Sequence, residues 1–243
     1  MPPSATVSRE TLERLLAQFS APASAAEPIA RVLALQASDP TASTTIRAPD
    51  EALDRHVADS LVALELAAVR EARRIADLGS GAGWPGLALA AALPDARVAL
   101  VESQARHCRY LERAAAVARL SNVEIVNARA EEWPAGVEAH DLVTARALAA
   151  LAVICEYAAP LLAQGGHLVA WKGAVGEAEK RAGVAAASEL GLDLVEVRPV
   201  RPFAGARDRT LHVFRKVAPT PARFPRRPGM ALKRPLGDRA GGE

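Results

Sequence analysis

A loop with three glycines at alternate positions, DLGSGAG, follows a short apolar run and leads into an apolar, helix-like segment. Gly79, Gly81 and Gly83 permit a tight turn and let bare backbone approach a ligand closely. Backbone amides at the start of a helix suit the polar groups of a nucleotide. The loop therefore indicates a nucleotide site, and a tight strand-to-helix turn without a ligand is the alternative that this motif alone leaves open.

A carboxylate ends the next apolar segment, ARVALVE, where Glu102 stands 23 residues beyond Gly79. If both segments are parallel strands, the end of the second lies beside the loop that follows the first. A carboxylate there accepts both hydroxyl protons of a ribose. The two features together predict a site for an adenosine-containing cofactor, and an exposed glutamate at a strand end is the plain alternative.

The glycine spacing and a preceding acid distinguish between two such cofactors. Dinucleotide enzymes usually carry G-x-G-x-x-G, with the pyrophosphate at the helix N-terminus. Here the spacing is G-x-G-x-G and Asp77 precedes it. An acid at a strand tip suits the cationic end of S-adenosylmethionine better than a pyrophosphate, through direct or water-mediated contact. We therefore favour S-adenosylmethionine over NAD, whose oxidoreductases remain the rival class.

The elements that must position these residues alternate between strand and helix from Arg74 onward. This rhythm predicts an α/β fold with a mostly parallel sheet. The last two strand segments, LDLVEVRPV and RTLHVFRKV, have no helix between them, so they are expected to pair antiparallel. Together with the preference for S-adenosylmethionine, this predicts a Rossmann-like class I methyltransferase fold. We divide the chain into a helical extension (1–72), the methyltransferase domain (73–217) and a basic Pro/Arg-rich tail (218–243) that is expected to be extended or mobile.

Charge is distributed unevenly along the chain. The net charge is +2 over 243 residues. From Arg198 to the end we count twelve Lys/Arg against three Asp/Glu, a balance of +9, which leaves 2 − 9 = −7 for the rest. A basic C-terminal part on an acidic body predicts a polyanionic partner, with a merely solubilising tail as the alternative. Because no signal peptide, membrane span or metal-ligand spacing is found, we expect a cytoplasmic protein without a metal.

Several motifs together resemble one known family. They are DLGSGAGWPG, RHVADS, VESQARHCRYL, ARAEEW, DLVTARALAAL, WKG and TPARFPRRPGMALKRPL. From about Thr44 to Leu236 the sequence resembles the bacterial RsmG family, once called glucose-inhibited division protein B. The resemblance implies transfer of a methyl group to N7 of one guanine in 16S (small-subunit) ribosomal RNA.

The resemblance also implies roles for individual residues. Ser80 and Trp84 join the three glycines in the cofactor loop, and Glu102 is the ribose acid. The backbone of Ala130 and Glu131 brackets the adenine. Arg146 lines cofactor and substrate, and the RHVADS segment helps to close the cofactor pocket, although Arg55 and Asp59 there also fit a plain surface ion pair. Trp84 and Trp171 are larger than the usual residues at their positions.

The remaining predictions concern the substrate. Lys172, after a strand tip, is expected to contact substrate, and it shares the catalytic assignment with Arg146. The residues expected to bind RNA are Arg209, Lys216, Arg223, Arg226, Arg227 and Lys233. Since N7 of guanine has a free lone pair, no general base is required. The alternatives are methylation of another RNA site, of a protein or of a small molecule, and a non-catalytic RNA-binding module. We expect a monomer that binds ribosomal RNA or the small subunit.

Overall fold

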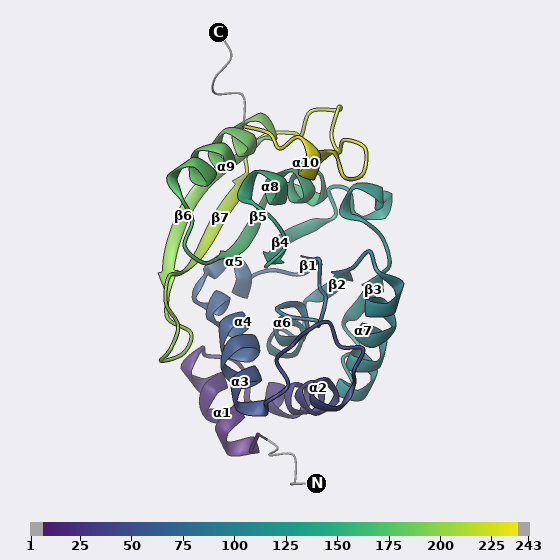
Figure 1. Ribbon diagram of the computed structural model, residues 1–243, viewed down its shortest axis with the longest axis vertical. Coiled ribbons are helices and arrows are strands. Elements are labelled where there is room, and N and C mark those ends of the chain that lie inside the picture. The colour runs from purple at the N-terminus through teal and green to yellow at the C-terminus, as the bar shows by residue number, and fades with distance from the viewer. Residues whose placement is uncertain (1–6, 238–243) are drawn as a thin grey trace.

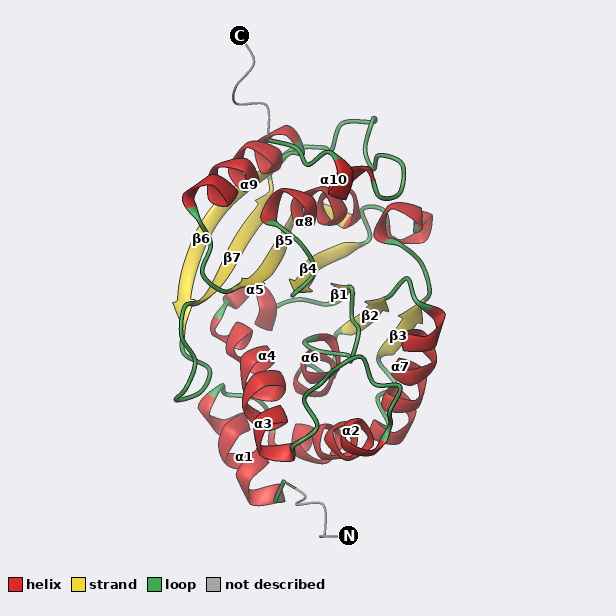
Figure 2. Ribbon diagram, viewed as in Figure 1, coloured by secondary structure: helices red, strands yellow, loops and turns green. Residues whose placement is uncertain are grey.

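A seven-stranded sheet forms the centre of the computed structural model, which describes residues 7–237 (Figures 1 and 2). The strand order is β3-β2-β1-β4-β5-β7-β6, and β7 runs opposite to the other six strands. This confirms the predicted mostly parallel sheet with an antiparallel final pair. The strands are β1 (Arg74–Leu78), β2 (Arg97–Val101), β3 (Val123–Val126), β4 (His140–Arg146), β5 (Leu162–Lys172), β6 (Leu192–Val200) and β7 (Arg209–Lys216).

Helices cover both faces of this sheet. Successive residues of a strand point to opposite faces, and in the central strands the residues on both faces are apolar. Ile75 packs into one hydrophobic cluster and its neighbour Ala76 into the other. The N-terminal helices, α6 and α7 contribute to the first cluster, and α8, α9 and α10 contribute to the second. The helices are α1 (Arg9–Gln18), α2 (Ala26–Ser38), α3 (Pro49–Ala52), α4 (Asp59–Leu61), α5 (Ala67–Arg70), α6 (Gly86–Ala92), α7 (Ala105–Ala118), α8 (Leu151–Ala158), α9 (Glu177–Glu189) and α10 (Met230–Lys233).

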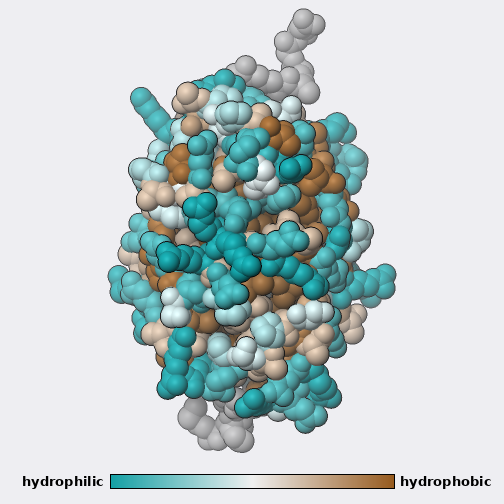
Figure 3. Space-filling model, turned by 180° about the vertical axis from the view of Figure 1, so that it is seen from behind, coloured by the Kyte–Doolittle hydropathy of each residue, from teal (hydrophilic) through white to brown (hydrophobic). Residues whose placement is uncertain are grey.

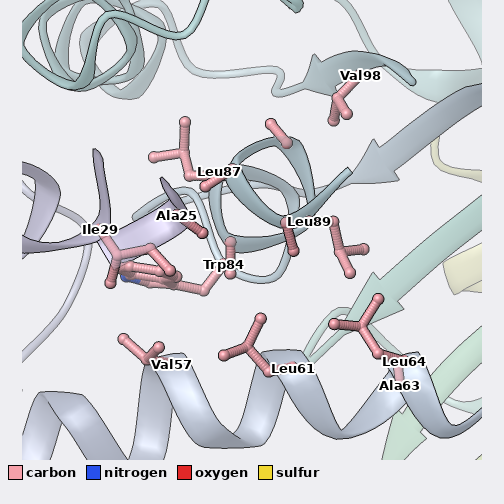
Figure 4. Close-up of a cluster of buried hydrophobic side chains, with 14 of the residues drawn as sticks. Ala25, Ile29, Val57, Leu61, Ala63, Leu64, Trp84, Leu87, Leu89 and Val98 are labelled. Atoms are coloured by element: carbon pink, nitrogen blue, oxygen red, sulfur yellow. The ribbon is translucent and has the colours of Figure 1, made fainter. Parts of the chain in front are cut away.

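The N-terminal helices share a core with the sheet. The side chain of Ser8 caps α1, as the sequence predicts. A buried stripe that includes Val57 and Leu61 lies next to Trp84 and α6 (Figure 4). Residues 53–58, between α3 and α4, form a π-helical turn, and Val57 of the stripe lies within it. The division at residue 72 stays a prediction, and the packing across it is continuous.

The C-terminal segment is packed, which corrects the expectation of extended or mobile chain for its described part, residues 218–237. Phe224 and Ala231 are buried in the cluster that contains α8. In Figure 1 this segment, drawn in yellow-green and yellow, lies beside α8 and α9. Proline and arginine content favours exposed chain, but a few well-spaced apolar side chains are enough to hold this segment against the domain.

The surface seen from behind is mixed in polarity. Hydrophilic side chains form a band across the middle of this face, and apolar ones lie on either side of it (Figure 3). Within residues 7–237, no helix combines the length and hydropathy needed to cross a bilayer.

Candidate functional site

A hollow of about 360 Å³ opens at the carboxyl ends of β1 and β2. Its walls include Gly79, Gly81 and Glu102, together with residues 128–131 after β3. In an open α/β sheet, ligands bind at this edge, where the strand order reverses. The order here reverses between β1 and β4. We call this space the loop hollow.

The glycine loop adopts backbone conformations with positive φ, which residues other than glycine rarely adopt. Gly79, Gly81 and Gly83 have φ values of 65°, 51° and 95°. The amides of Gly79 and Ser80 donate to the carbonyl of Val101 at 2.9 and 3.3 Å, which ties the loop to β2. A Cβ at Gly83 would lie 2.2 Å from the Leu87 side chain. Gly79 and Gly81 therefore face the hollow, whereas Gly83 and Ser80 shape the turn behind it.

Glu102 sits across from this loop at the end of β2. One carboxylate oxygen accepts from the amide of Gly81 at 3.1 Å, and the other accepts from the amide of Gln104 at 2.8 Å. A carboxylate has about four acceptor directions, so each oxygen retains capacity for one more donor, and Glu102 lines the hollow. The arrangement fits a ligand with two neighbouring hydroxyl groups, such as a ribose.

Asp77 lies beneath the loop and is not in the lining of the hollow. Its carboxylate accepts from the hydroxyl of Thr144 at 2.8 Å and from the amide of Gly86 at 3.3 Å. Burial raises the pKa of Asp77 to about 6, although these hydrogen bonds oppose the shift. Asp77 therefore joins β1, β4 and the start of α6, and a cationic ligand would feel its charge only through the loop.

Trp84 is buried in the core and does not line the loop hollow, so its placement differs from the cofactor contact that the resemblance implies. Its indole N–H donates to the side chain of Gln36 at 2.7 Å, and its ring stacks on His56 with centroids 5.8 Å apart. Figure 4 shows the ring between Ile29 and Val57. A large ring at this position is accommodated because it fills the space between α2, the π-helical turn and α6.

The predicted adenine-bracketing pair lines the loop hollow. Ala130 and Glu131 both contribute to its wall. The carboxylate of Glu131 also accepts from the amide of Gly229 at 3.1 Å, and Leu232 of the C-terminal segment completes the same wall. Leu232 and Tyr157 are not predicted from the sequence. Leu232 is an apolar residue inside the Pro/Arg-rich motif and Tyr157 lies in no motif, so each reaches the hollow only through tertiary packing.

A second hollow, of about 330 Å³, lies beside the first. It is lined by residues at the carboxyl ends of β4 and β5, the start of β7 and the π-helical turn. Ala149, in the loop after β4, lines both hollows. We call the second space the arginine hollow. Its polar lining residues are Arg55, His56, Asp59, Arg146, Lys172 and Arg209.

Arg146 is held firmly at the base of the arginine hollow. It donates to the Asp59 carboxylate at 2.9 Å, to the Arg55 carbonyl at 3.0 Å and to the His56 ring at 3.2 Å. Because burial lowers the pKa of Arg146, these acceptors, led by Asp59, sustain its charge. Three of its five N–H groups are thus engaged within residues 7–237, which leaves two donors for a ligand.

The contacts of His56 define its tautomer. A guanidinium only donates, so Nδ1 of His56 accepts from Arg146 and Nε2–H donates to the Thr44 hydroxyl at 3.1 Å. Burial and the nearby Arg146 lower the pKa of His56 to about 3. His56 is therefore a neutral support for Arg146. The plain alternative, a surface ion pair between Arg55 and Asp59, does not form: Arg55 binds Glu51 at 2.7 Å, while Asp59 is buried against Arg146.

Lys172 lies on the other side of the arginine hollow. Its ammonium contacts the Glu179 carboxylate at 2.7 Å and donates to the carbonyl of Ala149 at 3.0 Å. It therefore braces the loop that separates the two hollows. The RHVADS segment borders the arginine hollow and not the loop hollow, so its placement differs from the cofactor-closing role that the resemblance implies.

The six residues expected to bind RNA fall into two groups. Lys216 and Arg226 are engaged internally, which corrects their assignment. The ammonium of Lys216 is buried and donates to the Ala159 carbonyl at 2.6 Å, and burial lowers its pKa to about 8. Arg226 forms a bidentate ion pair with the buried Glu156.

The other four retain exposed charge. Arg223, Arg227 and Lys233 are exposed, and Arg223 also pairs with Glu189 at 3.0 Å. Arg209 is half-buried at the rim of the arginine hollow. These residues lie at the carboxyl edge of the sheet or on the C-terminal segment, so a polyanion can reach them from solvent.

Comparison with known proteins decides the family. The family described as rRNA small subunit methyltransferase G matches residues 36–202. The chain belongs to this family. A relative from Rubrobacter xylanophilus, named Ribosomal RNA small subunit methyltransferase G, is 43% identical over 202 residues, covering 81% of this chain and 77% of its own. A relative of the same name from Deinococcus radiodurans is 38% identical over 215 residues, covering 86% and 85%.

Solved structures agree with the fold of the methyltransferase G family. A protein from Agrobacterium tumefaciens described as a predicted O-methyltransferase aligns with a TM-score of 0.52 and 25% identity, over 67% of this chain and 80% of its own. Fibrillarin from Aeropyrum pernix, solved with S-adenosyl-L-methionine, aligns with a TM-score of 0.52 and 23% identity, over 65% and 72%. The predicted Rossmann-like class I methyltransferase fold and the family resemblance are therefore both confirmed.

Proposed function

We propose that this enzyme transfers the methyl group of S-adenosylmethionine to N7 of a guanine in 16S ribosomal RNA. The observation that carries the proposal is the adjacency of the two hollows, which meet at Ala149. One hollow has the glycine loop and carboxylate suited to an adenosine. The other has guanidinium and ammonium groups suited to a nucleotide. The names of the methyltransferase G relatives support small-subunit ribosomal RNA as the substrate.

The loop hollow fits the methyl donor residue by residue. Glu102 keeps two acceptor directions for ribose hydroxyls, while its bonds to Gly81 and Gln104 hold the carboxylate in place. Ala130 and Glu131 line this hollow, and the resemblance assigns their backbone to the adenine. Asp77 supplies negative charge beneath the loop. When bound, the donor supplies an electrophilic sulfonium methyl group, and the protein needs only to position it.

The arginine hollow positions the acceptor base. N7 of guanine carries an in-plane lone pair and no proton, so the transfer requires no general base. Arg146 has two donors left for O6 of the base or for a phosphate. Lys172 keeps the wall between the hollows in place. Holding two reactants in line lowers a barrier by roughly 7–11 kcal/mol in favourable cases, which is the main contribution expected of these residues.

The exposed basic residues make the longer-range contacts to RNA. We assign phosphate contacts to Arg209, Arg223, Arg227 and Lys233, since arginine binds phosphate in bidentate fashion and stacks on unpaired bases. The target base must leave its stack to enter the arginine hollow, which costs a few kcal/mol. We place the reaction in the cytoplasm and expect a monomeric enzyme, which light scattering on the purified protein checks.

Two measurements test the proposal. Titration calorimetry should detect binding of S-adenosylmethionine and no binding of NAD. Small subunits from cells that lack the enzyme should then accept a labelled methyl group, whereas large subunits should not. Saturable NAD binding, or equal labelling of both subunits, would reject the proposal.

A further inference from the structure

A buried carboxylate oxygen in the arginine hollow lacks a hydrogen-bond donor. Asp59 is 2% exposed, and its Oδ1 has no hydrogen-bond partner within residues 7–237. Its other oxygen accepts from Arg146 at 2.9 Å. Arg209 forms a long ion pair with Oδ1, and its Nε lies 3.7 Å away, too far for a hydrogen bond. A charged oxygen buried without a donor is costly, so its presence beside an open hollow indicates a ligand donor.

The surroundings of Asp59 hold it in this position. The indole N–H of Trp171 donates to the backbone carbonyl of Asp59 at 2.7 Å. The bond from Arg146 fixes the side chain. The carboxylate therefore cannot turn to find another partner without breaking a buried ion pair, and Asp59 stays in the wall of the hollow that Arg146, Lys172 and Arg209 also line.

The chemistry of the nucleobases selects one partner for this oxygen. The Watson–Crick edge of guanine carries two neighbouring donors, N1–H and the N2 amino group, and enzymes commonly read a flipped base through this edge. Adenine, cytosine and uracil do not present two adjacent donors there. N7 is on the opposite side of the purine. A guanine whose N1/N2 edge meets Asp59 would therefore direct N7 away from it, toward the boundary at Ala149.

We propose that Asp59 Oδ1 accepts hydrogen bonds from the N1/N2 edge of the target guanine and makes Asp59 the residue that selects guanine. The inference rests on the proposed function and adds a specificity element to it. Arg146 contacts both the Asp59 carboxylate and the guanine in this arrangement, because it holds Asp59 in place and still has donors for O6 of the base.

The test compares two RNA substrates that differ only at the target base. One carries guanine and the other carries inosine, which lacks the N2 amino group but keeps N1–H and N7. The wild-type enzyme should show a kcat/KM for guanine about 10- to 100-fold above that for inosine, as expected for the loss of one hydrogen bond to a charged group. Equal values for the two substrates in the wild-type enzyme would overturn the inference without any variant.

The variant Asp59→Asn adds a readout that a merely structural role would not move. Asparagine has an accepting oxygen at only one of the two carboxylate positions and an NH2 donor at the other, so either the bond from Arg146 or the contact with the base is lost, and the guanine-to-inosine ratio should fall to about threefold or less. Asp54→Asn, an exposed aspartate of the same π-helical turn, is the matched control and should keep the wild-type ratio. If Asp59→Asn lowers kcat/KM for both substrates by the same factor, Asp59 only supports Arg146 and the inference is wrong. If the wild-type enzyme methylates N7 in neither RNA, the proposed function fails as well.

Discussion

Replacing Glu102 with alanine is the sharpest perturbation of the loop hollow. The carboxylate holds the amides of Gly81 and Gln104 and has one acceptor direction left on each oxygen. Alanine removes both ligand bonds and releases the loop. Hydrogen bonds to charged groups contribute roughly 1.5–3 kcal/mol each. Because neighbouring bonds are not additive, we expect about 1.5–3 kcal/mol in total, which raises the Kd for S-adenosylmethionine by about 10- to 100-fold.

Titration calorimetry measures this change directly. A donor analogue that lacks one ribose hydroxyl should bind the wild-type protein more weakly, and the analogue and the donor should bind Glu102→Ala with similar affinity. Glu112→Ala, on the exposed side of α7, is the control and should bind like the wild type. An unchanged Kd for Glu102→Ala would refute the assignment of this carboxylate to the ribose.

Three further predictions use the titration and charge of named groups. The pKa of His56 is lowered from 6.5 to about 3, so the unfolded state binds the proton first and stability falls as pH drops below 6.5. Chemical denaturation should show the wild type losing ~2 kcal/mol more than His56→Gln between pH 6.5 and 5. The pKa of Asp77 is raised from 3.8 to about 6, so the native state loses stability as pH rises through this window. Asp77→Asn should therefore gain up to ~3 kcal/mol relative to the wild type between pH 3.8 and 7 in the same assay, and a parallel pH dependence would contradict this. Finally, RNA affinity should fall steeply with salt, and Arg227→Ala should reduce the slope of log K against log salt by about 1, whereas the buried Lys216→Met should leave the slope unchanged.

The loop hollow could be predicted from the sequence because its parts follow local rules. The glycines come directly after β1, and Glu102 comes directly at the end of β2. In a parallel sheet these strand ends meet at one edge, so spacing along the chain is enough to bring them together. The predicted order of strands and helices from β1 onward is confirmed for the same reason.

The arginine hollow depends on contacts between distant parts of the chain. Asp59 and Arg146 are 87 residues apart, and no periodic pattern links them. Arg55 is much closer to Asp59 in the sequence, at helical spacing, so an ion pair between these two is the alternative that the sequence offers, whereas the structure pairs Asp59 with Arg146. The π-helical turn shifts the register of this segment and directs Asp59 inward.

The buried Lys216 shows the limit of counting charges. Adjacent strand residues point to opposite faces, so only one of Arg215 and Lys216 can face solvent. Arg215 is exposed, and Lys216 turns toward the layer of helices. A basic run in the sequence does not reveal which residue takes which face. The packed C-terminal segment follows from the same cause, because Phe224 and Ala231 find a tertiary surface that composition does not describe.

Mass spectrometric mapping of the modified nucleoside tests the central claim most directly. Small subunits from cells that lack the enzyme are incubated with the protein and with S-adenosylmethionine labelled at the methyl group. We predict one labelled nucleoside, 7-methylguanosine, in 16S ribosomal RNA, and its loss with Arg146→Ala. A label on another atom, on another base or on ribosomal protein would contradict the account of two adjoining hollows that bring an adenosyl donor to N7 of guanine.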